Sequence, residues 1–234
     1  MVSDRAIDVW AAVAAAHRGD GQVSVATVCR AAVTRLGVDG ASVTATGSLT
    51  AREPLAASDD LSALLEDLQF TTGEGPAGDD FRLGSPVLLE DLEAAATRWP
   101  GFVSAAVSAG ARAMFAFPLQ VGAVRVGVLS LYRAAPGPLT ADALADALVL
   151  ADIALHLVLD AASGISESPD YHPMNGLSDS RASVYQATGM ISVQLGVGIE
   201  EAFVRLRAHA FASGSALAEV AAEVVSRRLR LDSA

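Results

Sequence analysis

Residues 181–231 read RASVYQATGMISVQLGVGIEEAFVRLRAHAFASGSALAEVAAEVVSRRLRL. Apolar residues recur at helical spacing in three successive segments of this stretch, which predicts three short amphipathic helices with almost no spacer between them. The three apolar faces consist of Val184, Ala187, Ile191 and Leu195, then Phe203, Leu206 and Ala210, and finally Leu217, Val220, Ala221 and Val224.

Local signals mark where these helices begin and end. Gly196 and Gly198 are expected to stop the first helix. Glu200 and Glu201 then fall in the first turn of the second helix, where carboxylates favour the positive end of the helix dipole. Ser215 is the expected N-cap of the third helix.

Polar residues accompany each apolar face. The first helix carries a second stripe that is expected to stay polar at the surface, made of Arg181, Tyr185, Thr188 and Ser192. Arg205 and Arg207 lie beside the apolar face of the second helix. On the third helix, the spacing of Glu223 and Arg227 predicts an i,i+4 ion pair.

The stretch resembles the ANTAR domain, a three-helix RNA-binding module of bacterial transcription antiterminators. The matching residues are Arg181, Gln186-Ala187-Thr188-Gly189-Met190, Glu201-Ala202-Phe203, Leu206-Arg207, Ala210 and Glu219-Val220-Ala221. The resemblance implies a small three-helix bundle over residues 178–234. It also implies that this bundle holds hairpin loops of nascent RNA, so that terminators do not form and transcription reads through. Members of the family often carry Lys at the position of Thr188.

Six residues are the expected RNA contacts under this resemblance: Arg181, Tyr185, Thr188, Gly189, Arg205 and Arg207. The planar guanidinium of arginine suits phosphate and stacks on splayed bases. Tyr185 offers a stacking surface of the kind used for single-stranded loops, and Gly189 would let helices or RNA approach closely. The alternative is that these arginines form surface ion pairs with Glu200 and Glu201.

Charge is divided unevenly along the 234 residues. All 16 basic residues are arginine; 10 of them, against 21 Asp and Glu, precede Ser178, and the remaining residues are balanced at six of each sign. A net charge of −11 argues against non-specific nucleic-acid binding, which depends on neutralising phosphates. It still allows a local arginine face in the C-terminal part.

Cys29 is the one cysteine, which excludes internal disulfides and cysteine zinc sites. It shares a helical face with apolar residues and is therefore expected to be a small core residue. The four histidines show no metal-ligand spacing, so no metal and no cofactor are expected. No apolar run reaches the ~18 residues of a membrane span, and no cleavage signal is visible at the N-terminus. We expect a cytoplasmic protein.

Residues 1–162 alternate between helical and strand patterns. Helices are expected at 4–18, 24–36, 59–70, 102–109 and 140–161, and strands at 41–48, 52–57, 86–89, 113–119 and 124–132, with a loop at 71–80. Ser58 is the expected cap of the third helix, Asp91 the cap of a short helix, and Gly122 the site of a tight turn. This order predicts an α+β domain with a central antiparallel sheet flanked by helices.

This part resembles a GAF domain, a sensory module often placed before ANTAR in actinobacteria. The matching residues are 68–76, Pro86-Val87, Asp91-Leu92, Arg98-Trp99-Pro100, 115–119, 127–129 and 131–133. The resemblance implies a domain that senses a signal, with a small molecule as its possible ligand. Together the two resemblances imply a GAF and ANTAR regulator of transcription antitermination, of the actinobacterial type.

The residue types of the segment 73–78 match the dinucleotide-binding glycine pattern, but their structural context does not. It follows a helix instead of a strand, and Pro76 removes an amide that a phosphate would need. We interpret it as a constrained loop over the sensory pocket, in which Glu74, Gly75 and Pro76 are weak candidates for ligand contact. Hydrogen bonds from backbone amides to Glu74 are the structural alternative. No catalytic motif is present, and we expect no enzyme.

The helix expected at 140–161 carries two apolar lines. One steps by four and three like a heptad seam, through Leu144, Leu148, Ala151, Leu155 and Val158; the other contains Leu150, Ile153 and Leu157. One line would cover the sheet, and the other would meet the same helix of a second copy in a homodimer. Glycine, proline and serine in residues 163–177 predict a linker.

Two other functions fit the C-terminal helices. They could bind a protein partner, which a neutral charge balance suits. They could also imitate a helix-turn-helix on DNA, although Glu219 and Glu223 of the third helix would then face phosphates.

Overall fold

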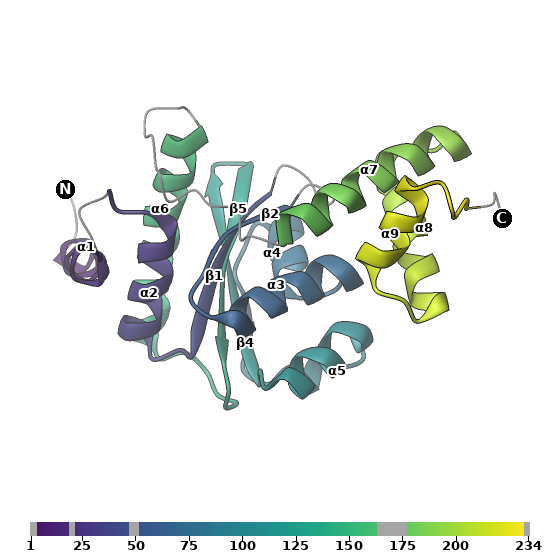
Figure 1. The fold of residues 1–234 in the computed structure, drawn as a ribbon. Helices are drawn as coiled ribbons and strands as arrows, with labels where there is room; N and C mark the ends of the chain where they lie inside the picture. The colour runs from purple at the N-terminus through teal and green to yellow at the C-terminus, as the bar shows by residue number, and fades with distance from the viewer. Residues whose placement is uncertain (1–3, 19–21, 47–51, 163–176, 232–234) are drawn as a thin grey trace. The chain divides into compact units, whose positions relative to one another are not determined.

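The computed structural model of the chain describes residues 4–18, 22–46, 52–162 and 177–231. The chain divides into two compact units, which contain the described residues 4–162 and 177–231 (Figure 1). Most of the predicted linker lies outside the described residues. Its last residue, Leu177, already begins the first helix of the second unit.

The first unit is built on one five-stranded antiparallel sheet, in the order β2-β1-β5-β4-β3. Its strands are β1 (Gly40–Thr46), β2 (Arg52–Ala57), β3 (Val87–Leu89), β4 (Ala113–Val121) and β5 (Val124–Arg133). Gly122, with φ 58°, makes the tight turn of the β4-β5 hairpin, as predicted. Because side chains alternate along each strand, the sheet presents one face to each of two helical layers.

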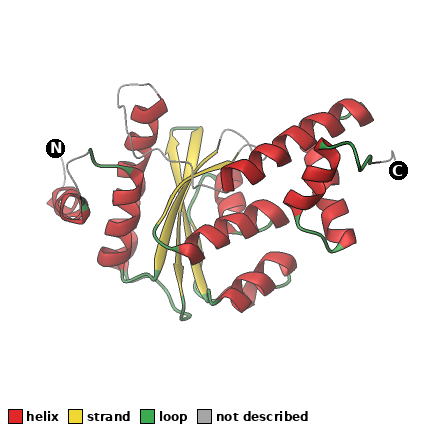
Figure 2. Ribbon diagram, in the orientation of Figure 1, coloured by secondary structure: helices red, strands yellow, loops and turns green. Residues whose placement is uncertain are grey.

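Helices cover both faces of this sheet (Figure 2). One layer consists of α1 (Asp4–Ala16), α2 (Val25–Leu36) and α6 (Ala141–Ala162); the other consists of α3 (Asp60–Thr72), α4 (Pro76–Leu83), the short 3-10 helix η1 (Leu92–Ala95) and α5 (Pro100–Ala109). Cys29 of α2 is completely buried in the first layer, and this burial raises the pKa of its thiol to about 12. The predicted α+β architecture and the core position of Cys29 are confirmed.

The two apolar lines of α6 both pack into its own domain. Ala151, Leu155 and Val158 of the heptad-like line are buried in the same core as Leu150 and Ile153 of the other line. The expectation that one whole line is free for a partner helix is therefore wrong, because the sheet and α2 cover both. Within this line, Leu148 remains at the surface, with 49% of its area exposed. Homodimerisation stays a prediction.

Two local predictions in the first unit are wrong. The segment 71–80, expected to be a loop, contains the end of α3 and the start of α4. Pro76 begins α4, because the first helical position has no use for the missing amide. The cap of α3 is Asp59, whose carboxylate accepts a hydrogen bond from the Ser62 amide at 2.6 Å, whereas Ser58 accepts one from the amide of Ala41.

The second unit is a bundle of three helices: α7 (Leu177–Leu195), α8 (Ile199–Ser213) and α9 (Leu217–Val225). The predicted apolar faces form its interior, and eleven buried residues fill it: Val184, Ala187, Ile191, Ala202, Phe203, Leu206, Ala210, Leu217, Val220, Ala221 and Val224. Gly196 lies in the left-handed region after α7, and Gly198 is the N-cap of α8, as expected. The N-cap of α9 is Ala216 instead of Ser215.

Candidate nucleic-acid interface and sensory site

Two of the four residues in the predicted polar stripe of α7 are buried. Arg181 is 4% exposed and Thr188 is 3% exposed, and the Thr188 hydroxyl donates to the Val184 carbonyl at 2.7 Å. Tyr185, the remaining expected RNA contact in this stripe, keeps 37% of its surface exposed. The expectation that this stripe stays at the surface is wrong for Arg181 and Thr188. The RNA contacts expected at Arg181, Tyr185 and Thr188 stay predictions. Of these three side chains, that of Tyr185 is the most accessible.

The arginines of α8 are engaged within the same unit. Both Nε and Nη2 of Arg205 donate to Oε1 of Glu201, at 3.1 and 2.7 Å. The guanidinium of Arg207 lies over the ring of Phe203, 3.9 Å from its centroid. The alternative of an intramolecular ion pair therefore holds for Arg205. RNA contacts at Arg205 and Arg207 stay predictions, and at Arg205 RNA would have to compete with Glu201.

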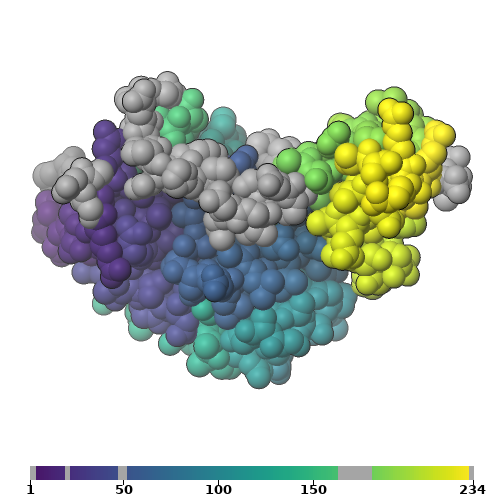
Figure 3. Space-filling view, viewed as in Figure 1, coloured from purple at the N-terminus to yellow at the C-terminus, as the bar shows by residue number. Residues whose placement is uncertain are grey.

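An open groove lies between α7 and the residues that follow α9, and we call residues 226–231 the C-terminal arm. The groove has a volume of about 810 Å³ and is lined by Gln186, Gly189, Met190, Val193, Gln194, Val224, Arg227, Leu229 and Arg230. In the space-filling view, the light-green residues of α7 lie against the yellow residues of α9 and the arm (Figure 3). Gly189 is the one expected RNA contact that lines this groove.

The arm has a fixed course. Arg227 adopts φ 59°, and its amide donates to the Val224 carbonyl at 2.9 Å. The side-chain amide of Gln194 donates to the Leu231 carbonyl, and Leu231 is buried. Because α9 ends at Val225, Arg227 lies outside the helix, and the predicted ion pair with Glu223 does not form.

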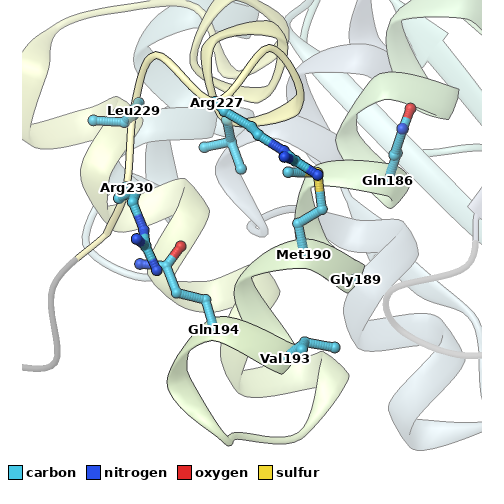
Figure 4. Close-up of a pocket in the computed structure, with 9 residues that line it drawn as sticks. Gln186, Gly189, Met190, Val193, Gln194, Arg227, Leu229 and Arg230 are labelled. Carbon is cyan, nitrogen blue, oxygen red and sulfur yellow. The ribbon is translucent and has the colours of Figure 1, made fainter.

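Arg227, Arg228 and Arg230 form the exposed cationic part of the arm. Within the described residues, no carboxylate pairs with any of them, and none of the nine residues that line the groove is acidic. Figure 4 shows the side chain of Arg227 reaching toward Met190 and that of Arg230 reaching toward Gln194. The groove thus combines two guanidinium groups, two side-chain amides and an apolar floor.

Sequence reasoning missed most of this groove. Arg227 was assigned to a helical ion pair, and Arg230 to no role. The available signal was three arginines in the four residues 227–230, with no acidic residue among them. Gln186 and Met190 were noted only as part of a motif, since their position beside the arm depends on where the chain turns after α9.

The predicted pocket loop of the first unit is held by internal contacts. Oε2 of Glu74 accepts hydrogen bonds from the amides of Gly101 and Phe102, at 2.9 and 3.0 Å, and so caps α5. Gly75 has φ 119°, and a β-carbon there would lie 2.7 Å from the Gln69 side chain. The structural alternative for Glu74 is confirmed. Ligand contact at Glu74, Gly75 and Pro76 stays a prediction.

The polar face of the sheet lies beneath α3 and α4. Ser42 and Thr44 of β1 donate to the two carboxylate oxygens of Glu66, at 3.0 and 2.8 Å. Thr46, further along β1, pairs in register with Arg52 of β2, so their side chains share this face. Buried polar side chains therefore replace apolar core along one side of the sheet.

Asp80 of α4 is fully buried at this face, and neither of its carboxylate oxygens has a hydrogen-bond partner among the described residues. Burial raises the pKa of Asp80 to about 8. The positive charges of Arg52 and, to a smaller extent, Arg125 lower this pKa but do not outweigh the effect of burial. The hydroxyl of Thr46 is also buried, and it too has no hydrogen-bond partner within the described ranges. Buried polar atoms are normally satisfied, so this cluster is a candidate place for a bound small molecule.

Two structural features are absent from the described residues. No group of three or more His, Cys, Asp or Glu side chains in them is arranged to hold a metal ion. No helix in them is both long and apolar enough to cross a membrane.

Comparison with known families identifies both units. The family model of the GAF domain matches residues 23–156, which is more than half of the chain. The chain belongs to the GAF domain family. The model of the ANTAR domain matches residues 177–225, which span α7 to α9. The chain therefore combines a GAF domain with an ANTAR domain, and the arm that lines the groove lies just beyond the ANTAR match.

Solved structures support the GAF fold. The GAF domain of a phosphoenolpyruvate-protein phosphotransferase from Acinetobacter is 14% identical, with a TM-score of 0.50, over 69% of this chain and 97% of that chain. The corresponding domain from Coxiella burnetii is also 14% identical, with a TM-score of 0.50, over 70% of this chain and 100% of that chain. No curated protein matches the sequence. GAF domains are signal sensors and ANTAR domains are RNA-binding antiterminator modules, so the chain is of a signalling and regulatory kind.

Proposed function

We propose that this chain is a signal-responsive RNA-binding regulator of transcription antitermination. In this proposal the GAF domain senses a signal and controls how the ANTAR domain holds hairpin loops in nascent RNA, in the cytoplasm where that RNA is made. The observation that carries the proposal is the set of exposed arginines in the arm, beside an open groove of the ANTAR unit, that have no carboxylate partner in the described part of the chain. Such a cationic surface suits phosphate even in a chain whose net charge is negative.

The proposed input is a small polar molecule bound at the face of the sheet beneath α4. Asp80 and Thr46 carry buried atoms that lack hydrogen-bond partners among the described residues. A ligand that supplies those hydrogen bonds would bind the folded domain in preference to the unfolded chain. It would therefore raise the melting temperature of the GAF domain in proportion to the logarithm of its concentration.

The test of RNA binding uses the full chain and a pool of hairpin RNAs that have a constant stem and a randomised loop. We expect binding that weakens steeply as salt rises, and no comparable binding to hairpin DNA of the same sequences. Transcription of a terminator-bearing template that encodes a selected hairpin should read through more often when the protein is added. Absence of RNA binding at low salt would refute the proposal. Light scattering of the full chain tests the proposed homodimer.

A protein partner is the second candidate, and one observation favours it. Val204, Ala208 and Phe211 lie at i, i+4 and i+7 on α8 and are exposed, with Val204 at 59% and Phe211 at 87%. An exposed apolar stripe of this kind is typical of a protein–protein contact. If Phe211→Ser abolishes function in cells while RNA affinity is unchanged, the ANTAR unit acts through a protein.

A further inference from the structure

The lining of the ANTAR groove has the three kinds of group that recognise one unpaired nucleotide. Met190 and Leu229 offer apolar surface to the face of a base. Gln186 and Gln194 carry amides, which both donate to and accept from base edges. Arg227 and Arg230 carry guanidinium groups suited to phosphate oxygens. Single-stranded RNA is recognised by this combination of stacking, edge hydrogen bonds and phosphate contacts.

Gly189 gives the groove a second feature that internal packing does not explain. It lies inside α7, where glycine is less favourable than alanine. An added β-carbon would meet nothing within 4 Å, so no neighbouring helix requires the missing side chain. The glycine instead leaves helix backbone open to the groove, which allows close approach by a ligand.

Arg227 gives a third feature. It is the only residue other than glycine in the described part of the chain that adopts a positive φ. Glycine is the usual residue at this position after a helix, because a side chain is strained there. The arm is also held in place by Gln194 and by the burial of Leu231, so the two guanidinium groups start from a defined backbone.

We propose that this groove holds a single unpaired ribonucleotide of the RNA loop. Its base lies on Met190 and Leu229 beside the open backbone of Gly189, and its flanking phosphates contact Arg227 and Arg230. The inference rests on the proposed RNA-binding function. It extends that function to the arm, which lies beyond the residues matched by the ANTAR model.

The arm provides its own matched control. Arg228 is exposed on the same segment and carries the same charge, but it does not line the groove. The full chain is titrated with the randomised-loop hairpin pool and with a blunt duplex of the same stem. Asn tolerates the left-handed conformation, so Arg227→Asn keeps the backbone of the arm.

We expect Arg227→Asn and Arg230→Gln each to weaken hairpin binding about tenfold and to reduce the salt slope by about 0.7, the value for one phosphate of a single strand. Arg228→Gln should stay within about twofold of the wild type. Duplex binding should be weak for every variant. Equal losses of hairpin affinity in the Arg227, Arg228 and Arg230 variants would indicate non-specific electrostatic attraction instead of a binding site. That result would overturn the inference.

Gly189→Ala separates binding from folding. Because alanine favours the helix and meets no neighbour, this variant should melt a few degrees higher than the wild type. It should nevertheless bind the hairpin pool about tenfold more weakly. Unchanged binding by Gly189→Ala, while the wild type binds RNA, would overturn the groove but leave the proposed function standing. A wild-type chain that binds no RNA would overturn both.

Discussion

The ANTAR unit contains two groups of three arginines that differ in their surroundings. The helix arginines are Arg181, which is buried, Arg205, which pairs with Glu201, and Arg207, which lies over Phe203. The arm arginines are Arg227, Arg228 and Arg230; they are exposed, and no carboxylate among the described residues pairs with them. The groups have equal formal charge, yet only in the arm are all three guanidinium groups exposed and without a carboxylate partner among the described residues.

The difference shows that formal charge does not locate a cationic surface. A guanidinium that is paired with a carboxylate, as in Arg205, has to give up that contact before it binds phosphate. An exposed guanidinium loses only water and counterions, and counterion release from the RNA favours binding. The residues that carry the family resemblance therefore need not be the ones that supply affinity for RNA.

The largest expected effect comes from removing charge in each group separately. The double variant Arg227→Asn with Arg230→Gln should bind the hairpin pool about 100-fold more weakly, since each phosphate contact contributes about tenfold. The double variant Arg205→Gln with Arg207→Gln should lose less than about threefold. Titrations of both full-length variants at one salt concentration make the comparison. Similar losses in both would remove the distinction between the groups.

The contrast between buried and exposed charged groups also applies to an acidic residue, Asp80 of the GAF domain. Its pKa is raised by burial to about 8, so the stability that it contributes is present below about pH 4 and is lost as pH rises through 8. Asp80→Asn removes this dependence. Between pH 5 and pH 8, the unfolding free energy of the variant should rise relative to that of the wild type by on the order of 3–4 kcal/mol, because the pKa shifts from 3.8 to about 8 and each pKa unit corresponds to about 1.4 kcal/mol.

Denaturant melts of the two full-length chains across this pH range measure the difference. A constant gap at every pH would mean that Asp80 is ionised in the folded domain.

Arg181 is expected to act on stability instead of affinity. Because the side chain is 4% exposed, Arg181→Ala removes buried packing and polar contacts, which should lower the unfolding free energy by about 1–3 kcal/mol. At a temperature where the variant is folded, its salt slope for hairpin binding should match that of the wild type. If the salt slope instead fell by about 0.7, the value for one phosphate contact, Arg181 would contact RNA directly. The distinction between the helix arginines and the arm arginines would then be weaker.

The smallest effect is expected for the exposed pair of α8. Arg205 and Glu201 lie at i,i+4 on the helix surface, where such pairs contribute about 0.3–0.5 kcal/mol. Glu201→Gln frees Arg205 without changing its charge. If the pair does hold Arg205 away from RNA, this variant should bind the hairpin pool slightly more tightly than the wild type. Weaker binding would show that Glu201 itself contacts the ligand.

Periodic signals in the sequence predicted the fold well. The apolar spacing of Val184, Ala187 and Ile191 identified the buried face of α7, because a 3.6-residue repeat fixes which side of a helix is covered. Conformational details were harder to predict. Pro76 reads as a breaker although it begins α4, and Asp59 and Ser58 are both plausible caps until the chain is folded.

The site was less predictable than the fold for a similar reason. The groove depends on α9 ending at Val225 and on Arg227 turning into the left-handed region, and no periodic pattern encodes such a turn for arginine. Arg181 was placed at the surface because its stripe is polar. The burial of Arg181 and Thr188 depends on tertiary contacts that spacing alone does not specify.

Cross-linking of the full chain to the hairpin pool by ultraviolet light, followed by mass spectrometry of the RNA-bound peptides, tests the central claim most directly. We predict nucleotide adducts on residues 185–194 of α7 and on the arm at 226–231, and a loss of the arm adducts in the Arg227→Asn with Arg230→Gln variant. Adducts confined to α8, around Arg205 and Arg207, would contradict the account and return the RNA contact to the helix arginines.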